Sequence, residues 1–466
     1  MKFSIASSQR VRRTLVFVAV ILAIAVAKQA QAQTETVLYS FTGSSDGGVP
    51  VAGLISDKDG NLYGTTSQYG DGPCVFPDAG CGTVFELMPT QEGGVVQWTF
   101  KLLYTFQGGS DGDNPKSDLA FDSLGNLYGT TARGGTGCAG SGCGTVFELE
   151  RSGDAWTENI LYRFTGGTDG SYPVGSLTLD AQGNIYGTAA YGGDINCING
   201  FGTGCGVVFR LSPTGASTEN TWALTVLHTF HGADGANPYV GVTLAPPQLC
   251  GASAEAVASS TVKPCIFGTT TNGAYTFTEP GGVVFQISPG LRTVSYNVLY
   301  KFPGGCGGPG GPLLLDKSGT LYGMTHLGGQ YCSGSVFTLS RNPTTGVWSE
   351  SDIYSFGGSG GWFPINQGAV MDPRGNLYGT TSRGGESLNC EAGCGTVFRL
   401  SKATGGGWYE SGLYSLQGGL DGWGPVSGSL VVNSTGVYGM TPSGGDPGCT
   451  GFDNQPGCGV IYRISP

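Results

Sequence analysis

The sequence contains very little histidine and few charged residues. Only three of its 466 residues are histidine (His228, His231 and His326), and Asp, Glu, Lys and Arg together make up 12%. The His-Glu-x-x-His motif of zinc proteases is missing, and no Gly-x-Ser-x-Gly stands between a strand and a helix, where the nucleophile elbow of serine hydrolases needs it. The sequence therefore offers no recognisable catalytic motif, and glycine, serine, threonine and asparagine must cover much of the surface.

Positive charge is scarce as well. The chain carries 22 Lys and Arg against 33 Asp and Glu, which gives a formal net charge of −11. An acidic chain lacks the basic patches with which proteins hold nucleic acid and anionic membrane surfaces. Neither partner is therefore expected.

The start of the chain carries an apolar run that is too short for a membrane span. Leu15–Ala27 follows basic residues and precedes Ala30-Gln31-Ala32, a set of small residues that suits a signal peptidase. The run is shorter than the roughly 20 residues that a bilayer requires. We predict that residues 1–32 are a cleaved signal peptide, with an uncleaved membrane anchor as the alternative. The mature protein is then secreted or periplasmic and has no membrane span.

Cys-x-x-Cys pairs are absent, although the chain has 14 cysteines. Without such pairs, and with so few histidines, a thiolate metal site is disfavoured. An even number of cysteines after a signal peptide indicates disulfides instead. The expected bonds join neighbouring cysteines: Cys74–Cys81, Cys138–Cys143, Cys197–Cys205, Cys250–Cys265, Cys306–Cys332, Cys390–Cys394 and Cys449–Cys458.

The sequence contains three short phrases that recur along its whole length. The phrase Gly-Asn-Leu-Tyr-Gly-Thr-Thr, or a near copy, occurs seven times, and its aromatic residue stands at Tyr63, Tyr128, Tyr186, Phe267, Tyr322, Tyr378 and Tyr438. Each copy is followed by Gly-Thr-Val-Phe-Glu-Leu or a variant, and then by Leu-Tyr-x-Phe. Three phrases in fixed order indicate one supersecondary unit repeated seven times.

One unit, residues 52–106, shows what is repeated. A tight turn at Asp57–Asn61 precedes a strand at Leu62–Thr66, and two further strands follow at Thr83–Leu87 and Trp98–Phe106. The third strand has apolar residues on both faces, so its sheet must be sandwiched between others, as in a β-propeller. The glycine of each second strand is interpreted as a close backbone approach near a crowded axis.

The two ends of the repeat array complement each other. The array begins with a fourth-strand phrase at 36–41 and ends with a third-strand phrase at 459–464. We expect the first strand to complete the last blade, which closes the ring and removes both free edges. The predicted fold is an all-β, seven-bladed β-propeller of four-stranded antiparallel blades, forming a single domain over 33–466. The expected blades span approximately 52–106, 117–164, 175–230, 240–302, 311–356, 367–416, and 428–464 plus 36–41.

The paired phrases Leu-Tyr-Gly-Thr-Thr and Gly-Thr-Val-Phe resemble those of the Gloeo/Verruco (GloVer) tandem-repeat family. The resemblance covers essentially the whole chain after the signal peptide. It implies an extracellular bacterial protein with a β-propeller-like repeat. It supplies no established activity and no catalytic residues that could be carried over.

The loops from fourth to first strands, and from second to third strands, emerge on one face of a propeller, here called the upper face. Five of the former loops repeat Gly-Gly-x-Asp-Gly or a near copy, with the acid at Asp46, Asp111, Asp169, Asp234 and Asp421. These carboxylates either form a partial ring that attracts Ca²⁺ or cationic ligands, or are turn residues. The turn interpretation is favoured, because carboxylates spread around a ring are too far apart to share one ion. No cofactor is therefore expected, with calcium left open.

Aromatic residues gather in the same loops, notably Tyr172, Tyr239, Trp362 and Trp423. Aromatic rings stack on sugar C–H surfaces while nearby polar groups bind hydroxyls, although such rings also serve simply to pack loops. We predict a monomeric binding or scaffold module whose ligand is a glycan or cell-surface polymer. The alternatives are a carbohydrate-active hydrolase or lyase with carboxylates in the central channel, and a purely structural protein.

Overall fold

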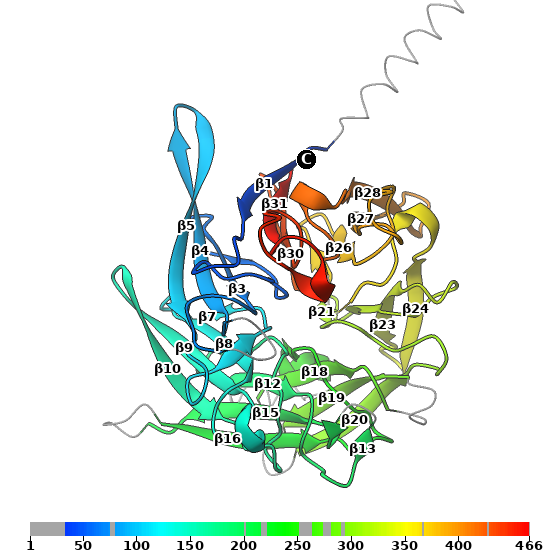
Figure 1. Cartoon of the computed structure of the whole chain (residues 1–466). Coiled ribbons are helices and arrows are strands. Elements are labelled where there is room, and N and C mark those ends of the chain that lie inside the picture. Colours follow the sequence, from blue (N-terminus) through cyan, green and yellow to red (C-terminus); the bar gives the residue numbers. More distant parts are fainter. Residues whose placement is uncertain are drawn as a thin grey trace, which may run out of the picture.

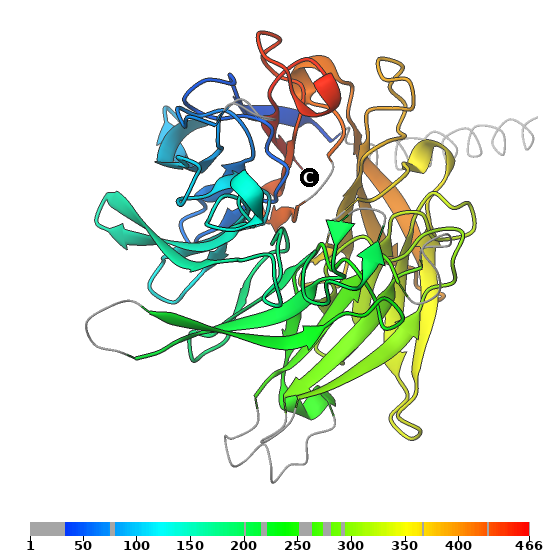
Figure 2. The same cartoon turned by 60° about the horizontal axis from the view of Figure 1, so that its bottom comes forward.

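Seven antiparallel β-sheets are arranged as a ring in the computed structural model (Figures 1 and 2). The structure describes residues 33–74, 80–199, 202–215, 221–250, 263–273, 281–289, 294–365, 368–425 and 428–465. The prediction of an all-β, seven-bladed propeller is confirmed. The expected signal peptide, residues 1–32, lies outside the described residues.

Each blade has four strands, and blade 2 has one additional short strand. Blade 1 comprises β2 (Ile55–Ser56), β3 (Leu62–Thr66), β4 (Thr83–Glu92) and β5 (Val95–Thr105); blade 2 comprises β6 (Asp113–Pro115), β7 (Ala120–Phe121), β8 (Leu127–Arg133), β9 (Thr145–Ser152) and β10 (Ala155–Arg163). Blade 3 comprises β11 (Thr178–Leu179), β12 (Ile185–Ala189), β15 (Val207–Pro213) and β16 (Trp222–Thr229); blade 4 comprises β17 (Thr243–Ala245), β18 (Cys265–Thr270), β19 (Val283–Pro289) and β20 (Val294–Lys301). Blade 5 comprises β21 (Leu314–Leu315), β22 (Leu321–Thr325), β23 (Ser335–Arg341) and β24 (Trp348–Ser355); blade 6 comprises β25 (Val370–Met371), β26 (Leu377–Thr381), β27 (Thr396–Lys402) and β28 (Trp408–Ser415). Blade 7 comprises β29 (Val431–Asn433), β30 (Gly436–Thr441), β31 (Val460–Ile464) and β1 (Glu35–Ser40).

The remaining elements are small and lie in the loops. A separate hairpin pairs β13 (Ile198–Asn199) with β14 (Gly202–Thr203). Single 3-10 turns occur at η1 (Cys138–Gly140), η2 (Pro247–Cys250), η3 (Gly358–Gly360), η4 (Gly419–Asp421) and η5 (Phe452–Asn454). In the described ranges no helix is long and apolar enough to cross a membrane.

The ring is closed by the pairing of β1 with β31 (Figure 1). Glu35 lies opposite Ile464 and Ser40 lies opposite Val460, so a strand from the start of the chain becomes the outer strand of blade 7. The predicted closure is confirmed. Because the pairing is antiparallel along the whole strand, the outer edge of β31 is covered.

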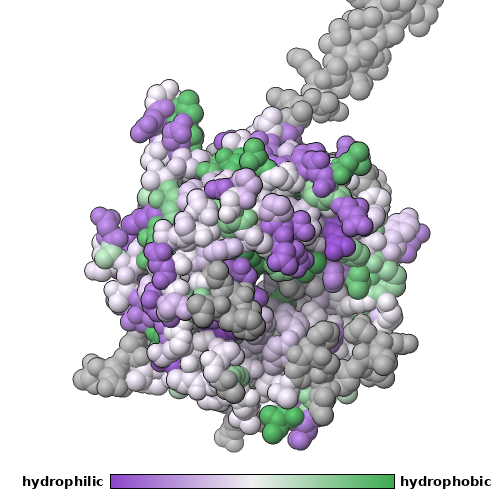
Figure 3. Space-filling view, viewed as in Figure 1, coloured by the Kyte–Doolittle hydropathy of each residue, from purple (hydrophilic) through white to green (hydrophobic). Residues whose placement is uncertain are grey.

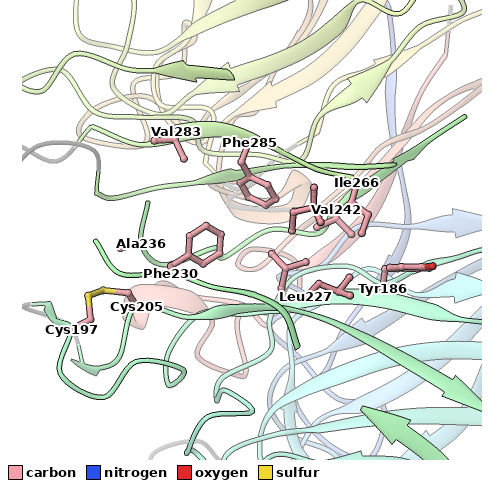
Figure 4. Packing of buried hydrophobic residues seen from close by; sticks show 12 residues of the cluster. Tyr186, Cys197, Cys205, Leu227, Phe230, Ala236, Val242, Ile266, Val283 and Phe285 are labelled. Carbon is pink, nitrogen blue, oxygen red and sulfur yellow. A yellow bond between two sulfur atoms is a disulfide. The ribbon is translucent and has the colours of Figure 1, made fainter. Parts of the chain in front are cut away.

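The hydrophobic core is divided into seven clusters, one between each pair of neighbouring blades. Between blades 3 and 4, for example, Tyr186 and Leu227 pack with Ile266 and Phe285 (Figure 4). The third strands serve two clusters at once, because successive side chains point to opposite faces. Val84 belongs to the cluster with blade 2, whereas the adjacent Phe85 belongs to the cluster with blade 7. The prediction that each sheet is sandwiched is confirmed.

The glycine of each second strand has a different role from the one expected. Gly64 lies opposite Phe85 in the sheet register, and a Cβ on Gly64 would stand 2.7 Å from the Phe85 ring. The same clash, at 2.4 to 2.7 Å, recurs against an aromatic ring of the paired third strand in every blade. The interpretation as crowding at the axis is therefore wrong. The glycine makes room for a ring that lies across it within its own sheet.

All seven expected disulfides are formed. Five of them close a loop between the second and third strands of a blade, on the upper face. The described residues contain no free cysteine.

Candidate binding site on the propeller axis

A three-residue phrase with proline in the middle leads into the inner strand of every blade. The phrases are Val49-Pro50-Val51, Asn114-Pro115-Lys116, Tyr172-Pro173-Val174, Asn237-Pro238-Tyr239, Gly308-Pro309-Gly310, Phe363-Pro364-Ile365 and Gly424-Pro425-Val426. Each proline ring lies against a glycine of the preceding blade, such as Gly82 for Pro115, where an added Cβ would stand 2.7 Å from the proline Cδ. The same contact joins Pro50 to Gly459 across the closure of the ring. The glycine of the Gly-Thr-Val-Phe phrase thus leaves room for the proline ring of the next blade.

The residue before the proline is fixed by a second contact with the preceding blade. Tyr172 adopts a left-handed backbone with φ of 59°, and its N–H donates to the Cys143 carbonyl at 2.9 Å. Asn114 and Asn237 have the same conformation and donate to the carbonyls of Cys81 and Cys205. The positive φ is uncommon for a bulky residue such as tyrosine. Because the acceptor lies in a disulfide-closed loop, the disulfide and the proline together set where the flanking side chains point.

Six of these flanking residues line a cavity of about 290 Å³ that lies on the axis of the ring. Its described lining draws at least one residue from every blade: Val51, Lys116, Tyr172, Tyr239, Pro312, Ile365 and Phe452 for blades 1 to 7 respectively. Phe452 lies in the loop between β30 and β31, so the cavity reaches the upper face. The space-filling view is hollowed near the middle of the ring (Figure 3). We call this space the axial cavity.

Tyrosine hydroxyls and one lysine supply polar groups at the wall of the axial cavity. Lys116 Nζ lies 3.4 Å from the Tyr172 hydroxyl and 5.9 Å from the centre of the Tyr172 ring. The hydroxyls of Tyr191 and Tyr239 are 2.5 Å apart, and the Tyr172 and Tyr191 rings lie 5.4 Å apart. Burial raises the pKa of Tyr191, and burial together with the Tyr191 hydrogen bond raises that of Tyr239. Both phenols therefore remain neutral near pH 7.

Asp118 is the only carboxylate in the described lining of the axial cavity. Its Oδ1 accepts the Gly53 N–H at 2.6 Å and its Oδ2 accepts the Ser429 N–H at 3.3 Å. Gly53 and Ser429 belong to blades 1 and 7, which also contact each other directly through Leu54 N–H and the Ser429 carbonyl at 3.1 Å. The carboxylate is therefore held by backbone donors on both sides of the junction between the first and last blades.

The structure separates the aromatic residues that the sequence placed together. Tyr172 and Tyr239 line the axial cavity, whereas Trp362 and Trp423 are not among its lining residues. Trp362 instead lies in a shallow depression between blades 5 and 6 with Tyr331. A ligand role for any of the four stays a prediction.

The five aspartates of the Gly-Gly-x-Asp-Gly loops accept hydrogen bonds from their own loop and strand. In four blades the carboxylate accepts a tyrosine hydroxyl from seven residues earlier: Tyr39 to Asp46 (3.0 Å), Tyr104 to Asp111 (2.9 Å), Tyr162 to Asp169 (3.0 Å) and Tyr414 to Asp421 (3.0 Å). Asp234 pairs with His228 Nε2 at 3.0 Å instead. None of the five is among the lining residues of the axial cavity. Their predicted roles in ligand or calcium binding remain untested.

The described residues contain one cluster with the spacing of metal ligands, and it does not suit a metal. It consists of Cys74, Cys81 and Asp113. Because Cys74 and Cys81 form a disulfide, their sulfurs are not available as thiolates.

Sequence reasoning missed Lys116, Asp118 and Tyr191. The proline phrase could have pointed to Lys116, because the phrase occurs once in each unit and the residues flanking the proline change from blade to blade. Tyr191 stands two residues after the second-strand phrase of blade 3, and its backbone bridges to Ser171. Its contact with Tyr239 of the next blade depends on the packing between blades, which the spacing of the phrases does not give.

Several solved structures are distantly similar to the chain. They include a protein of unknown function from Dyadobacter fermentans DSM 18053, with 11% identity over 93% of this chain and 100% of that chain and a TM-score of 0.39. The periplasmic gluconolactonase of Pseudomonas aeruginosa has 14% identity over 78% of this chain and 84% of that chain, with a TM-score of 0.44. A puromycin-hydrolyzing peptidase of Mycobacterium tuberculosis has 11% identity over 92% of this chain and 54% of that chain, with a TM-score of 0.47. Likenesses this distant carry no conclusion about what the present protein does.

Comparison with curated protein sequences gives no match. A family model described as the Gloeobacter/Verrucomicrobia repeat matches residues 25–263 and 261–466. The two matches together take in every blade of the ring, and the phrases that they cover are the strands and glycines described above. The chain therefore belongs to the Gloeobacter/Verrucomicrobia repeat family.

Proposed function

We propose that this protein is an exported binding module that holds one sugar unit, free or at the end of a glycan, in the axial cavity. The observation that carries the proposal is the composition of that cavity. Tyr172 and Tyr239 present aromatic surface and hydroxyl groups beside small and apolar residues from every blade except blade 2, which contributes Lys116 and Asp118. Ligand sites of this kind are concave and mostly apolar, with a few placed polar groups. The volume of about 290 Å³ lies at the low end for small-molecule sites, which suits a single unit better than a length of polymer.

The two alternative functions find less support in the cavity. A glycoside hydrolase needs two carboxyl groups flanking the bond to be cleaved, and the described lining contains only Asp118. A purely structural ring has no use for an open axial space lined by tyrosines and a lysine. Export is supported by the seven disulfides, and N-terminal sequencing of the secreted protein tests cleavage after Ala32.

Calorimetric titration with a panel of monosaccharides and oligosaccharides tests the binding site. Two variants remove aromatic rings while using residues that this fold already accepts at equivalent positions. Tyr172→Asn copies Asn114 and Asn237, which share its left-handed backbone, and Tyr239→Val copies Val174, which also follows the proline. We expect both variants to weaken binding at least about tenfold, which corresponds to about 1.4 kcal/mol.

The tryptophans on the upper face provide the comparison. Trp362→Ala and Trp423→Ala should leave binding within about twofold of the unmodified protein, because neither side chain lines the axial cavity. If these variants abolish binding while the tyrosine variants retain it, the ligand sits in the outer loops. If no sugar in the panel binds, the proposal is refuted.

A further inference from the structure

Lys116 is the only charged residue among the seven that directly follow the repeated proline. It directly follows the proline of its blade, where the other blades have Val51, Val174, Tyr239, Gly310, Ile365 and Val426. The packing of the proline against the preceding blade is the same in all seven cases. The fold therefore does not need a cation at this position, and the lysine is explained by what it offers to the axial cavity.

No described carboxylate forms an ion pair with Lys116. Among the described residues, the ion pairs are Lys58–Asp59, His228–Asp234 and His231–Asp194, and none of them involves Lys116. Its described polar contact is a neutral one, with the Tyr172 hydroxyl at 3.4 Å.

Asp118, the one acidic group in the described wall of the axial cavity, already accepts hydrogen bonds from the backbone. Both oxygens of Asp118 accept backbone N–H groups, from Gly53 and Ser429. Such charge-assisted bonds stabilise the carboxylate where it is. In a protein with a net charge of −11, a half-buried lysine at a cavity wall that has no carboxylate partner among the described residues is a specific feature.

We infer that Lys116 selects an acidic sugar, such as a hexuronic acid, and binds its carboxylate in the axial cavity. An ammonium group on a flexible stem suits a carboxylate approached from varied angles. Lys116 would hold the charged group while the adjacent Tyr172 ring stacks against the sugar and the Tyr239 hydroxyl meets a ring hydroxyl. This inference rests on the proposed function and adds the chemical class of the ligand.

The test compares sugars that differ only at the charged group. Glucuronic acid is titrated against glucose, and galacturonic acid against galactose, by calorimetry with the full mature protein. A charge-assisted hydrogen bond accounts for about ten- to a hundredfold in affinity, so each uronic acid should bind tighter than its neutral counterpart by that factor. The preference should shrink as salt is raised, because a partly exposed ion pair is screened.

Two lysine variants connect the preference to this side chain. Lys116→Val copies Val51 and Val174 at the equivalent position, so the fold should be retained, as judged by the melting temperature. It should remove the preference for uronic acids, so that each uronic acid binds no tighter than its neutral counterpart. Lys116→Arg keeps the charge and should keep most of the preference.

The outcomes separate this inference from the proposed function. If glucose and galactose bind as well as the uronic acids, and Tyr172→Asn weakens both, the axial site stands and the acidic preference is refuted. If the uronic acids are preferred but Lys116→Val leaves that preference intact, the assignment to Lys116 is refuted. If neither class of sugar binds, both the inference and the proposed function fail.

Discussion

Replacing Gly323 with alanine should destabilise the propeller although it adds only one methyl group. Gly323 lies in β22, opposite Phe337 in the register with β23. A Cβ at this position would stand 2.4 Å from Phe337 Cζ, 2.7 Å from its Cε1 and 3.0 Å from Leu313 Cδ2. Carbon atoms pack best at about 3.5 to 4.0 Å, so the phenylalanine ring would have to move by about 1 Å. Phe337 is completely buried between blades 4 and 5 and has no open space to move into.

The expected loss follows from two opposing terms. Inserting a methyl group into a packed core costs about 1 to 3 kcal/mol. Alanine is also the better residue in the middle of a strand, by about 0.5 to 1 kcal/mol, because glycine loses more conformational freedom on folding. The free energy of unfolding should therefore fall by about 1 to 2 kcal/mol.

Urea unfolding followed by tryptophan fluorescence measures the change. Gly405→Ala is the matched control, because Gly405 lies in the exposed turn between β27 and β28 and a Cβ there would meet no atom within 4 Å. Its effect should stay within about 0.5 kcal/mol. In the double variant Gly323→Ala/Phe337→Leu, the smaller side chain should relieve the clash, so the combined loss should be less than the sum of the single losses. Unchanged stability of Gly323→Ala, or strict additivity in the double variant, would show that the ring does not depend on the glycine.

Three further perturbations test other parts of the molecule. Burial, and next the charge of Asp111, raises the pKa of Glu158 to about 8. Between about pH 4.5 and 8 the folded protein therefore keeps a proton on Glu158 that the unfolded chain has lost. The melting temperature should fall as the pH rises through this range, and Glu158→Gln should flatten that fall. An unchanged pH profile in the variant would count against this assignment. Deleting residues 33–41 removes β1 and uncovers the edge of β31, so the truncated chain should aggregate or dimerise in light-scattering measurements, and a stable monomer would contradict the closure. Asp118→Ala leaves two backbone N–H groups at the axis without their acceptor, which should lower the free energy of unfolding by about 1 to 3 kcal/mol in urea; a loss below 0.5 kcal/mol would refute the role given to this carboxylate.

The architecture could be predicted because the sequence pattern of one blade occurs seven times in the chain. Each phrase taken alone is a weak signal for a strand. Its recurrence in a fixed order makes the assignment firm and gives the number of blades. Closure was predictable since residues 36–41 repeat the fourth-strand phrase that the unit at 428–464 does not itself contain. The disulfides were predictable because each bond joins two cysteines that are consecutive in the sequence.

The axial site was harder to predict because a shift of one residue decides which side chains reach it. Tyr172 stands directly before its proline and Tyr239 directly after, and both line the axial cavity. Trp362 and Trp423 stand two residues before theirs, and neither lines it. The loop phrases alone do not give this register, which is set by the contact of the proline with a glycine of the neighbouring blade.

The glycine of the second strand shows a similar limit. Its recurrence at the same place in every unit was visible, but the reason for it was not. Gly64 and Phe85 are 21 residues apart in sequence, and only the pairing of β3 with β4 brings the ring of one over the other. Composition and spacing gave the position of the close contact and left the partner open.

The pairing of β1 with β31 has a consequence for how the molecule is made. The two strands are separated by more than 400 residues of chain, so this contact has almost the largest loop-closure cost that the sequence allows. During synthesis, blades 1 to 6 can assemble in order while the first strand waits without its partner. The contact between β1 and β31 can therefore form only after both segments have been synthesised, so ring closure is expected to be a late step in folding.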